Sequence, residues 1–500
     1  MELRLSGLRR LPSPLVAAVA LVAAGSLATL GARAEASPAA KASAAGTVLQ
    51  TNLVSDLPGV AALDDPNLVN PWGISESGGS PFWISDNNAG RSTLYNVPGN
   101  GGSPAINPLV VNIPTPTSST DGTPTGTVFN LASGGFPISG PNKNGQTVTV
   151  PAVFLFATED GTIAGWNPAV DPTGQFAGPS GISAQAVIAV DNSGNNFTNP
   201  DPTQQTGAVY KGLAIATSNA PITAGDSDST ALLYASNFRA GTVDVFDANF
   251  HTVTALPAGA FQDPGLPRDY APFNVQVLGA KVYVTYAKQN ATRHDDVAGP
   301  NHGFVDVFNL DGTPGLPGGA MRLISRDSLN SPWGLAIAPP GFAGLSAPHN
   351  DPVLLVGNFG NGFVNAFDAT TGSRLGRLHD PDGEPIQIDG LWALKVGNGA
   401  SGGAADQVYF TAGLFGESHG LFGSLATAVP GSPEGPAEAQ WVQANLDLVQ
   451  LDLQQLSSDS SSGAPLVTIR QDVRTLNADS RQLVRVQRAF GRDAINDATH

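Results

Sequence analysis

The feature that most constrains the fold is a short pattern that recurs six times, at intervals near sixty residues. Each copy is an apolar run around one key position, as in NPWGI from Asn70 and SPWGLAIAP from Ser331. The key positions are Trp72, Phe129, Lys211, Phe273, Trp333 and Trp392, separated by 57, 82, 62, 60 and 59 residues. The long interval contains a polar stretch at 191–207, which predicts a surface insertion. A period of this length indicates a repeat architecture in which neighbouring units pack together.

Two further runs in every unit predict additional strands. The second run is apolar, as in PVLLVGNF from Pro352, and the third alternates, as in GTVDVFDA from Gly241. Both have the length and composition of strands and are separated by turn residues. With a weaker outer strand such as SRLGRLHD from Ser373, each unit becomes a four-stranded antiparallel blade. Six blades closed about an axis form a β-propeller, which leaves only short, protected edges.

The composition agrees with an all-β fold. The 500 residues include 59 Gly and 40 Pro, too many helix breakers for a mainly helical chain, and 41% hydrophobic residues, enough for a sizeable core. Several β-sandwiches are the alternative, but unrelated sandwiches would not repeat the same elements at a near-constant spacing. We therefore predict an all-β, six-bladed β-propeller over residues 47–427.

Charge and motifs exclude several classes of function. The formal net charge of −17 would repel phosphate backbones, so we expect no nucleic-acid partner. The chain has no cysteine, which excludes disulfides, thiolate metal sites and a cysteine nucleophile. The sequence also lacks the HExxH and P-loop patterns. Its matches to G-x-S-x-G (Gly399–Gly403 and Gly416–Gly420) and to G-x-G-x-x-G (Gly397–Gly402) lie between or at the ends of predicted strands, without the helix that follows a nucleophile elbow or a dinucleotide-binding turn. Hydrolase, phosphate-transfer and redox chemistry therefore have no positive support from motifs.

The first 34 residues have the order of a secretory signal peptide. Arginines at 4, 9 and 10 precede an apolar run from Leu15 to Leu30, and Ala32-Arg33-Ala34 resembles a cleavage site. A membrane anchor is the alternative, but this run is shorter than the roughly 20 apolar residues that a span needs. We predict a signal peptide at 1–34, a linker at 35–46, a secreted (extracellular or periplasmic) protein, and no membrane span after cleavage.

The last seventy residues differ from the repeats. A Pro-, Gly- and Ala-rich linker at 428–439 precedes two apolar stripes with helical spacing, which predict an α-helical hairpin at 440–500. Its second helix would carry on one face Arg470, Arg474, Arg481, Arg485 and Arg488. A solvated charged face is one interpretation of this stripe, and a surface that mediates docking or assembly is the other.

The NPWGI, VDVFD and DGLW elements resemble an uncharacterised family of secreted bacterial proteins whose repeats are similar to NHL-type six-bladed propellers. The resemblance covers residues 47–427 and brings no established reaction with it. This chain departs from the pattern at Ala393, where the other Trp-containing units have Gly, and in its C-terminal extension.

In a propeller, the connections that enter the innermost strands share one face with the loops between second and third strands. We therefore expect a ligand-binding face on that side. Its candidates are Asp86, Asn87, Arg91, Glu159, Asp160, Asn237, Arg239, Lys288, Asn358, Asp389, Glu417 and His419.

Two features suggest a metal. Asp389-Gly390-Leu391 resembles the element that supplies an acidic metal ligand in gluconolactonase-like propellers. Ca²⁺ or another divalent cation needs about six oxygen ligands, for which Asn274 and Asn130 are the remaining candidates. Asp389 could instead be a turn or cap residue. A polar loop at 287–303 holds His294, Asp295, Asp296 and His302. These residue types can bind Zn²⁺, and a solvated polar loop without a metal is the alternative interpretation.

The leading hypothesis is a secreted, non-enzymatic propeller that binds an extracellular ligand, glycan or protein on one face. A metal-assisted extracellular hydrolase or lactonase acting at Asp389 is the alternative, and it requires Asp389, Asn274, Asn130 and Glu159 to converge at the axis. A third possibility is a propeller that serves as a spacer for a functional hairpin. Fold alone does not separate the three, since propellers host many functions.

Overall fold

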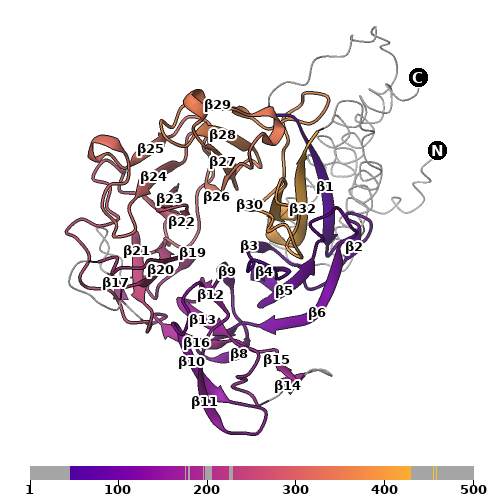
Figure 1. The fold of residues 1–500 in the computed structure, drawn as a ribbon, viewed down its shortest axis with the longest axis vertical. Helices are drawn as coiled ribbons and strands as arrows, with labels where there is room; N and C mark the ends of the chain where they lie inside the picture. The colour runs from indigo at the N-terminus through magenta and orange to yellow at the C-terminus, as the bar shows by residue number, and fades with distance from the viewer. Residues whose placement is uncertain are drawn as a thin grey trace. The chain divides into compact units, whose positions relative to one another are not determined.

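The computed structural model describes residues 46–428, with gaps at 175, 178–180, 195, 198–204 and 224–228, and the single positions 454 and 458. Residues 46–57 and 61–428 belong to one compact unit. Six sheets surround an axis in this unit, and their strands are antiparallel except for the parallel pair of β1 (Val48–Ser55) with β2 (Leu63–Asp64) (Figure 1). The predicted six-bladed β-propeller is confirmed.

The first three blades follow each other along the chain, each with its innermost strand first. Blade 1 has the order β3 (Pro71–Ser75), β4 (Phe82–Asp86), β5 (Arg91–Asn96), β6 (Ala105–Asn112). Blade 2 consists of β9 (Pro124–Phe129), β12 (Phe154–Thr158), β13 (Thr162–Trp166), β16 (Val187–Asp191). Blade 3 has β19 (Tyr210–Thr217), β20 (Ala231–Asn237), β21 (Thr242–Asp247).

The next three blades continue the ring. Blade 4 has β22 (Tyr270–Leu278), β23 (Lys281–Lys288), β24 (Phe304–Phe308), β25 (Arg322–Ser325). Blade 5 has β26 (Pro332–Ile337), β27 (Val353–Asn358), β28 (Val364–Asp368) and, as predicted near Ser373, β29 (Arg374–Arg377). Blade 6 has β30 (Leu391–Val396), β31 (Val408–Gly413), β32 (His419–Thr427), β1 (Val48–Ser55), β2 (Leu63–Asp64).

Blade 6 closes the ring with strands from both ends of the described chain. Strand β1 pairs antiparallel with β32, from Val48 opposite Thr427 to Ser55 opposite Leu421. These backbone hydrogen bonds join the first blade-forming strand to the last. Because β32 pairs with β1 on one side and with β31 on the other, the last strand of the described chain is not an edge strand. Closure of this kind limits the exposed sheet edges of a propeller.

Short elements decorate the blades. Four two-stranded pairs are β7 (Pro114–Thr115) with β8 (Ser118–Asp121), β10 (Pro137–Pro141) with β11 (Thr147–Pro151), β14 (Phe176–Ala177) with β15 (Ile182–Ser183), and β17 (Asn196–Phe197) with β18 (Gln205–Thr206). The short helical turns are η1 (Asn87–Ala89), η2 (Pro317–Gly319), η3 (Phe342–Gly344), η4 (Pro348–Asn350) and α2 (Leu414–Glu417).

The innermost strands approach each other closely at the axis, and this explains the Gly in the repeated pattern. A Cβ atom on Gly126 of β9 would lie 2.2 Å from the backbone nitrogen of Leu213 in β19. No side chain fits there without moving a strand. Beside these contacts, buried aromatic residues from four blades meet in one cluster: Trp72, Phe273, Trp333 and Trp392.

The alignment of the repeats needs one correction. In blade 1 Pro71 pairs with Asp86, and in blade 5 Pro332 pairs with Asn358. The equivalent pair in blade 2 is Pro124 with Thr158, so the counterpart of Trp72 is Thr125 and not Phe129. The apolar run that contains Phe129 was the stronger hydrophobic signal, but the strand begins earlier, in a segment of small and polar residues.

Several predictions fall outside the described residues. These are the signal peptide (1–34), the two linkers (35–46 and 428–439) and the helical hairpin (440–500), apart from positions 46, 428, 454 and 458. The hairpin is not supported: of its range only positions 454 and 458 are described, and two isolated helical positions do not show a hairpin. No helix in the described ranges has the length and hydrophobicity that a membrane crossing requires.

Candidate functional site

Polar side chains gather at the end of the axis where the innermost strands begin. We call this group the polar mouth: Asn70, Asn87, Glu159, Lys211, Asp295 and Glu417. Asn70 directly precedes β3, Lys211 lies at the start of β19, and Glu159 follows β12. The strands of adjacent blades run in the same direction at the axis, so these sequence-distant residues share one face.

Lys211 lies at the centre of the polar mouth. Its side chain is only 3% exposed, and its Nζ contacts Glu159 Oε1 and lies 3.6 Å from an oxygen of Asp295. Nζ also lies 5.0 Å from the centre of the Trp72 ring. Burial lowers the pKa of Lys211, but the carboxylates of Glu159, Asp295 and Asp296 outweigh this effect and raise it. Lys211 is therefore a buried ammonium, held by acidic partners.

Amide side chains connect Lys211 to the opposite side of the axis. Asn87 donates from Nδ2 to Glu159 Oε2 at 2.9 Å, and Asn70 donates from Nδ2 to Glu417 Oε2 at 2.9 Å. The same Nδ2 of Asn70 lies 3.4 Å from Asn87 Oδ1. One hydrogen-bonded chain thus runs from blade 6 through blade 1 to blades 2 and 3.

Glu417 is carried by a strained turn. Phe415, Gly416 and Glu417 all have positive φ, at 53°, 64° and 73°. Left-handed conformations are costly for residues other than Gly and persist where the surroundings impose them. Asp389 Oδ2 accepts a hydrogen bond from the Phe415 backbone nitrogen at 3.2 Å, and Asn88 donates to the Glu417 carbonyl at 2.6 Å. These contacts present the Glu417 carboxyl to the axis.

The environment of Glu417 shifts its acidity. Burial is the main cause and raises the pKa to about 7, while the hydrogen bond from Asn70 and the charge of Lys211 lower it in part. The charges of Glu159 and Asp296 raise it further. A perturbed carboxyl group beside a buried ammonium is typical of functional sites, although structural networks produce it too.

The β23–β24 loop adds His294, Asp295 and Asp296. His294 Nδ1 lies 2.8 Å from Asp295 Oδ1 and 4.0 Å from Glu159 Oε1. Asp295 has its pKa lowered to about 2, chiefly by the hydrogen bond with His294 and also by the charge of Lys211. Glu159, His294 and Asp295 each offer one ligand atom, and these atoms lie within 4.8 Å of one another. The group could hold a metal ion, but Lys211 already supplies a positive charge to it.

Aromatic rings form the floor beneath Lys211. Trp72 stacks on Trp392 with ring centres 3.5 Å apart, and Trp392 stacks on Phe359 at 4.0 Å. Trp392 Nε1 donates to Asn70 Oδ1, and Trp333 Nε1 donates to the Lys211 carbonyl. Within the described residues, Trp72 Nε1 is buried and has no hydrogen-bond partner. The aromatic floor of the polar mouth therefore includes a buried N–H donor, Trp72 Nε1, that the neighbouring described residues do not satisfy.

Of the residues predicted for the ligand-binding face, Asn87, Glu159 and Glu417 come together in the polar mouth, with Asp389 supporting Glu417. The others have local partners. Lys288 pairs with Asp269, His419 with Asp56, Asp160 with Thr123, Asn237 with Asp244, Arg239 with the carbonyls of Thr206 and Gly207, Asn358 with Ser328, and Arg91 with Asn67. Asp86 is fully buried, and burial raises its pKa well above the usual value.

The hydrogen bonds described for the three proposed metal ligands go to different partners. Asn130 donates to the carbonyls of Gly135 and Ala152 in its own blade. Asn274 donates to the Trp333 carbonyl, and Asp389 accepts from Phe415. The turn or cap interpretation of Asp389 therefore describes its observed contact.

Sequence reasoning did not select Asn70 or Lys211 as face residues, whereas it placed His294 and Asp295 in a loop of this face. Lys211 had a visible signal, because it is the one charged residue at a position that is aromatic in most repeats. His294 and Asp295 were candidates for a Zn²⁺ site within their own loop. Their contact with Glu159 joins blade 4 to blade 2, and spacing along the chain does not reveal such a contact.

Comparison with known proteins shows the family. No protein-family model matches the chain. Uncharacterized protein L690 of Acanthamoeba polyphaga mimivirus is 32% identical over 378 residues, which is 75% of this chain and 84% of the relative. Uncharacterized protein R648 of the same virus is 31% identical, over 75% of this chain and 78% of the relative. This chain belongs to their family.

The family of R648 and L690 has an uncharacterised role, and these relatives are viral. The expected bacterial origin is thus not shown, and the NHL-type repeat family is not confirmed. Among solved structures, an α-L-arabinanase of Penicillium chrysogenum has a TM-score of 0.38 at 10% identity, covering 76% of this chain and 98% of that one. A glucose dehydrogenase has a TM-score of 0.37 at 12% identity, covering 72% and 98%. Scores this low carry no argument about activity.

Proposed function

We propose that this member of the R648/L690 family is a secreted, non-enzymatic binding module that takes a cationic ligand at the polar mouth. The observation that carries the proposal is the convergence of Glu159, Asp295 and Glu417 from three different blades around the axis. Lys211 balances one of these carboxylates. Three carboxyl groups thus surround one ammonium group, with His294 beside Asp295.

The chemistry of the mouth suits an organic ammonium group. Asp295 is exposed and anionic, so its free lone pairs can accept hydrogen bonds from a ligand. A buried cation already lies among these groups, because the Lys211 ammonium is over the Trp72 ring and beside the carboxylates. Carboxylates beside aromatic rings recognise ammonium groups through charge, hydrogen bonds and cation–π contact. The acidic composition of the chain favours the same class of ligand.

Titration calorimetry with putrescine and with CaCl₂ tests the proposal. We expect putrescine to bind, and Asp295→Asn to weaken the binding about tenfold or more, which is the effect of losing one charge-assisted hydrogen bond worth roughly 1.5–3 kcal/mol. Asp382→Asn is the matched control, because Asp382 is an exposed acid in the turn after blade 5. Equal binding by Asp295→Asn and by the control would refute the proposal, as would the absence of binding.

A metal-assisted hydrolase is the second candidate, and the cluster of Glu159, His294 and Asp295 favours it. A divalent cation held there would polarise a substrate carbonyl. The ammonium of Lys211 argues against this use, because it competes for the same carboxylates. Elemental mass spectrometry of the purified protein separates the candidates. Stoichiometric metal that is lost in His294→Ala would favour the hydrolase, and metal-free protein that binds putrescine would favour the binding module.

A further inference from the structure

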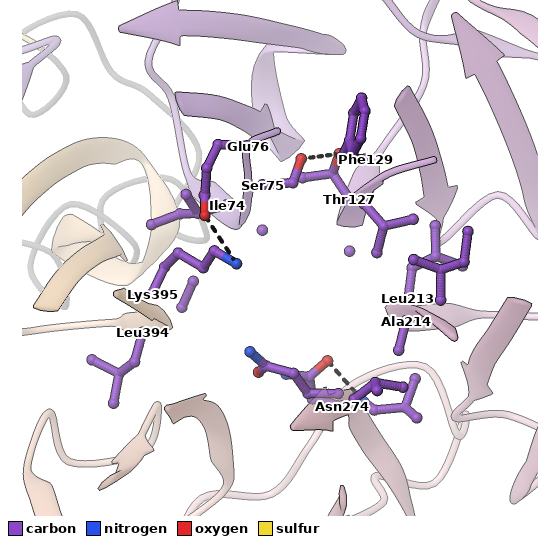
Figure 2. A pocket seen from close by; sticks show the side chains of 18 of the residues that line it. Ile74, Ser75, Glu76, Thr127, Phe129, Leu213, Ala214, Asn274, Leu394 and Lys395 are labelled. Atoms are coloured by element: carbon purple, nitrogen blue, oxygen red, sulfur yellow. Dashed lines mark hydrogen bonds and ion pairs between the residues drawn. The ribbon is translucent and has the colours of Figure 1, made fainter. Parts of the chain in front are cut away.

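A cavity lies farther along the innermost strands than the polar mouth. It has a volume of about 190 Å³ and is lined by residues of the innermost strands of all six blades and of the segments that follow them, with Trp333 as the one contribution of blade 5. We call it the axial chamber, and Figure 2 shows its lining around an open centre. It is smaller than the roughly 300–1,000 Å³ typical of pockets for drug-sized molecules, so it suits a small metabolite.

The axial chamber holds one acidic and one basic side chain. Glu76 Oε1 lies 3.1 Å from Lys395 Nζ, and the side chains are 7% and 33% exposed. The other oxygen, Glu76 Oε2, is buried and has no hydrogen-bond partner within the described residues. Burial raises the pKa of Glu76, and the charge of Lys395 lowers it in part. A buried carboxylate oxygen without a partner is costly, which points to a ligand that supplies a donor.

Lys395 can hydrogen-bond to a ligand while it remains paired with Glu76. An ammonium group has three N–H donors, and Glu76 uses one of them. The other donors can reach an acceptor in the chamber. The charged pair therefore offers both an acceptor, Glu76 Oε2, and a donor, Lys395 Nζ, at one wall.

The rest of the chamber has both polar and apolar lining, with Asn274 and Gln276 among the polar residues. Leu213 and Ala214 lie across the opening from Glu76 and Lys395, and Ile74 and Leu394 lie beside the charged pair (Figure 2). Ser75 and Thr127, which also line it, are hydrogen-bonded to each other at 3.0 Å. The chamber thus combines one neutralised pair of charges with an apolar wall.

We propose that the axial chamber binds a free α-amino acid with an aliphatic side chain. The ligand's ammonium group donates to Glu76 Oε2, its carboxylate accepts from Lys395 Nζ, and its side chain lies against Leu213 and Ala214. A zwitterion fits because it adds no net charge to a neutral pair. A diamine or a fatty acid would match only one of the two groups and leave the other unpaired.

Calorimetric titration of the full chain with L-leucine tests this inference. We expect saturable binding of L-leucine, and binding at least tenfold weaker for L-leucinamide, which lacks the carboxylate, and for 4-methylpentanoate, which lacks the ammonium. Leu-Gly distinguishes a peptide terminus, since its two charges are farther apart. No binding of L-leucine, or equal binding of any of the other three compounds, would overturn the proposal.

Variants connect the binding to the two charged residues. Glu76→Gln keeps the shape but loses the charge, and Lys395→Met removes the donor, so each should weaken L-leucine binding at least tenfold. Lys395→Arg should bind more tightly than Lys395→Met, and a thermal melt verifies that each variant is folded. Asp382→Asn, at an exposed acid in the turn after blade 5, should leave L-leucine binding unchanged. Because the two sites use different probes and residues, failure of one proposal is distinguishable from failure of the other.

Discussion

Replacing Lys211 with methionine tests whether the polar mouth is held together by a buried ion pair. The change keeps most of the apolar side chain but removes the ammonium beside Glu159, whose side chain is 10% exposed. Breaking one partner of a buried pair typically costs about 3–5 kcal/mol, because an uncompensated charge remains. The contact of the ammonium with the Trp72 ring is lost as well, and such contacts contribute roughly 0.5–2 kcal/mol. We expect the Lys211→Met variant to lose about 3–5 kcal/mol of unfolding free energy.

The corresponding change in melting temperature is modest because the unit is large. For roughly 380 residues at about 2.1 cal/mol/K each, the total entropy of unfolding is ~0.8 kcal/mol/K, and a change in unfolding free energy divided by this entropy gives the change in Tm. The predicted loss is therefore a decrease in Tm of about 4–6 °C. Differential scanning calorimetry measures it directly. Lys288→Met is the control, since Lys288 and its partner Asp269 are both substantially exposed, and it should cost less than about 1 kcal/mol.

A double variant provides the decisive measurement. If the cost of Lys211→Met comes from the unpaired charge of Glu159, then adding Glu159→Gln should recover a large part of it. Chemical denaturation of the two single variants and the double variant completes the cycle. A double variant no more stable than Lys211→Met would refute the argument, because the loss would then arise from packing or from the other carboxylates.

Two further predictions concern pH and packing. Glu417 has a folded pKa of about 7 against 4.5 for an ordinary glutamate side chain; the folded state binds its proton more tightly, so this group's contribution to stability falls as the pH rises from 4.5 to 7. Glu417→Gln should thus be more stable relative to the wild type at pH 8 than at pH 4.5, and a constant difference in calorimetric Tm would contradict this. Gly126→Ala places a Cβ atom 2.2 Å from the Leu213 nitrogen and should cost about 1–3 kcal/mol by denaturant unfolding. Gly78→Ala is the control, because Gly78 is exposed, has open space and, like Gly126, has no positive φ; an equal loss in both variants would argue against the clash.

The sequence by itself determined the repeat, the strands and the number of blades. Apolar runs near sixty-residue spacing must be buried between neighbouring units, and alternation along VDVFD-like segments is a local property of a half-buried strand. Such signals do not depend on which distant residues come into contact. The hydrophobic pattern misplaced the innermost strand of blade 2, which begins with Pro124 and Thr125. Small and polar residues do not give the apolar run from which a buried strand is predicted.

Tertiary structure decided which polar residues act together. The sequence selected Glu159 and Glu417 as face residues, but their connection through Asn70 and Asn87 depends on closure of the ring, which brings residue 417 to residue 70. Lys211 is buried among residues of four blades, and only the geometry of the axis gives a charged side chain its partners there. The Glu76–Lys395 pair likewise joins blade 1 to blade 6. Local patterns fix strands, whereas long-range closure fixes the sites between them, because hydrogen bonds and ion pairs form across blades that are far apart in the chain.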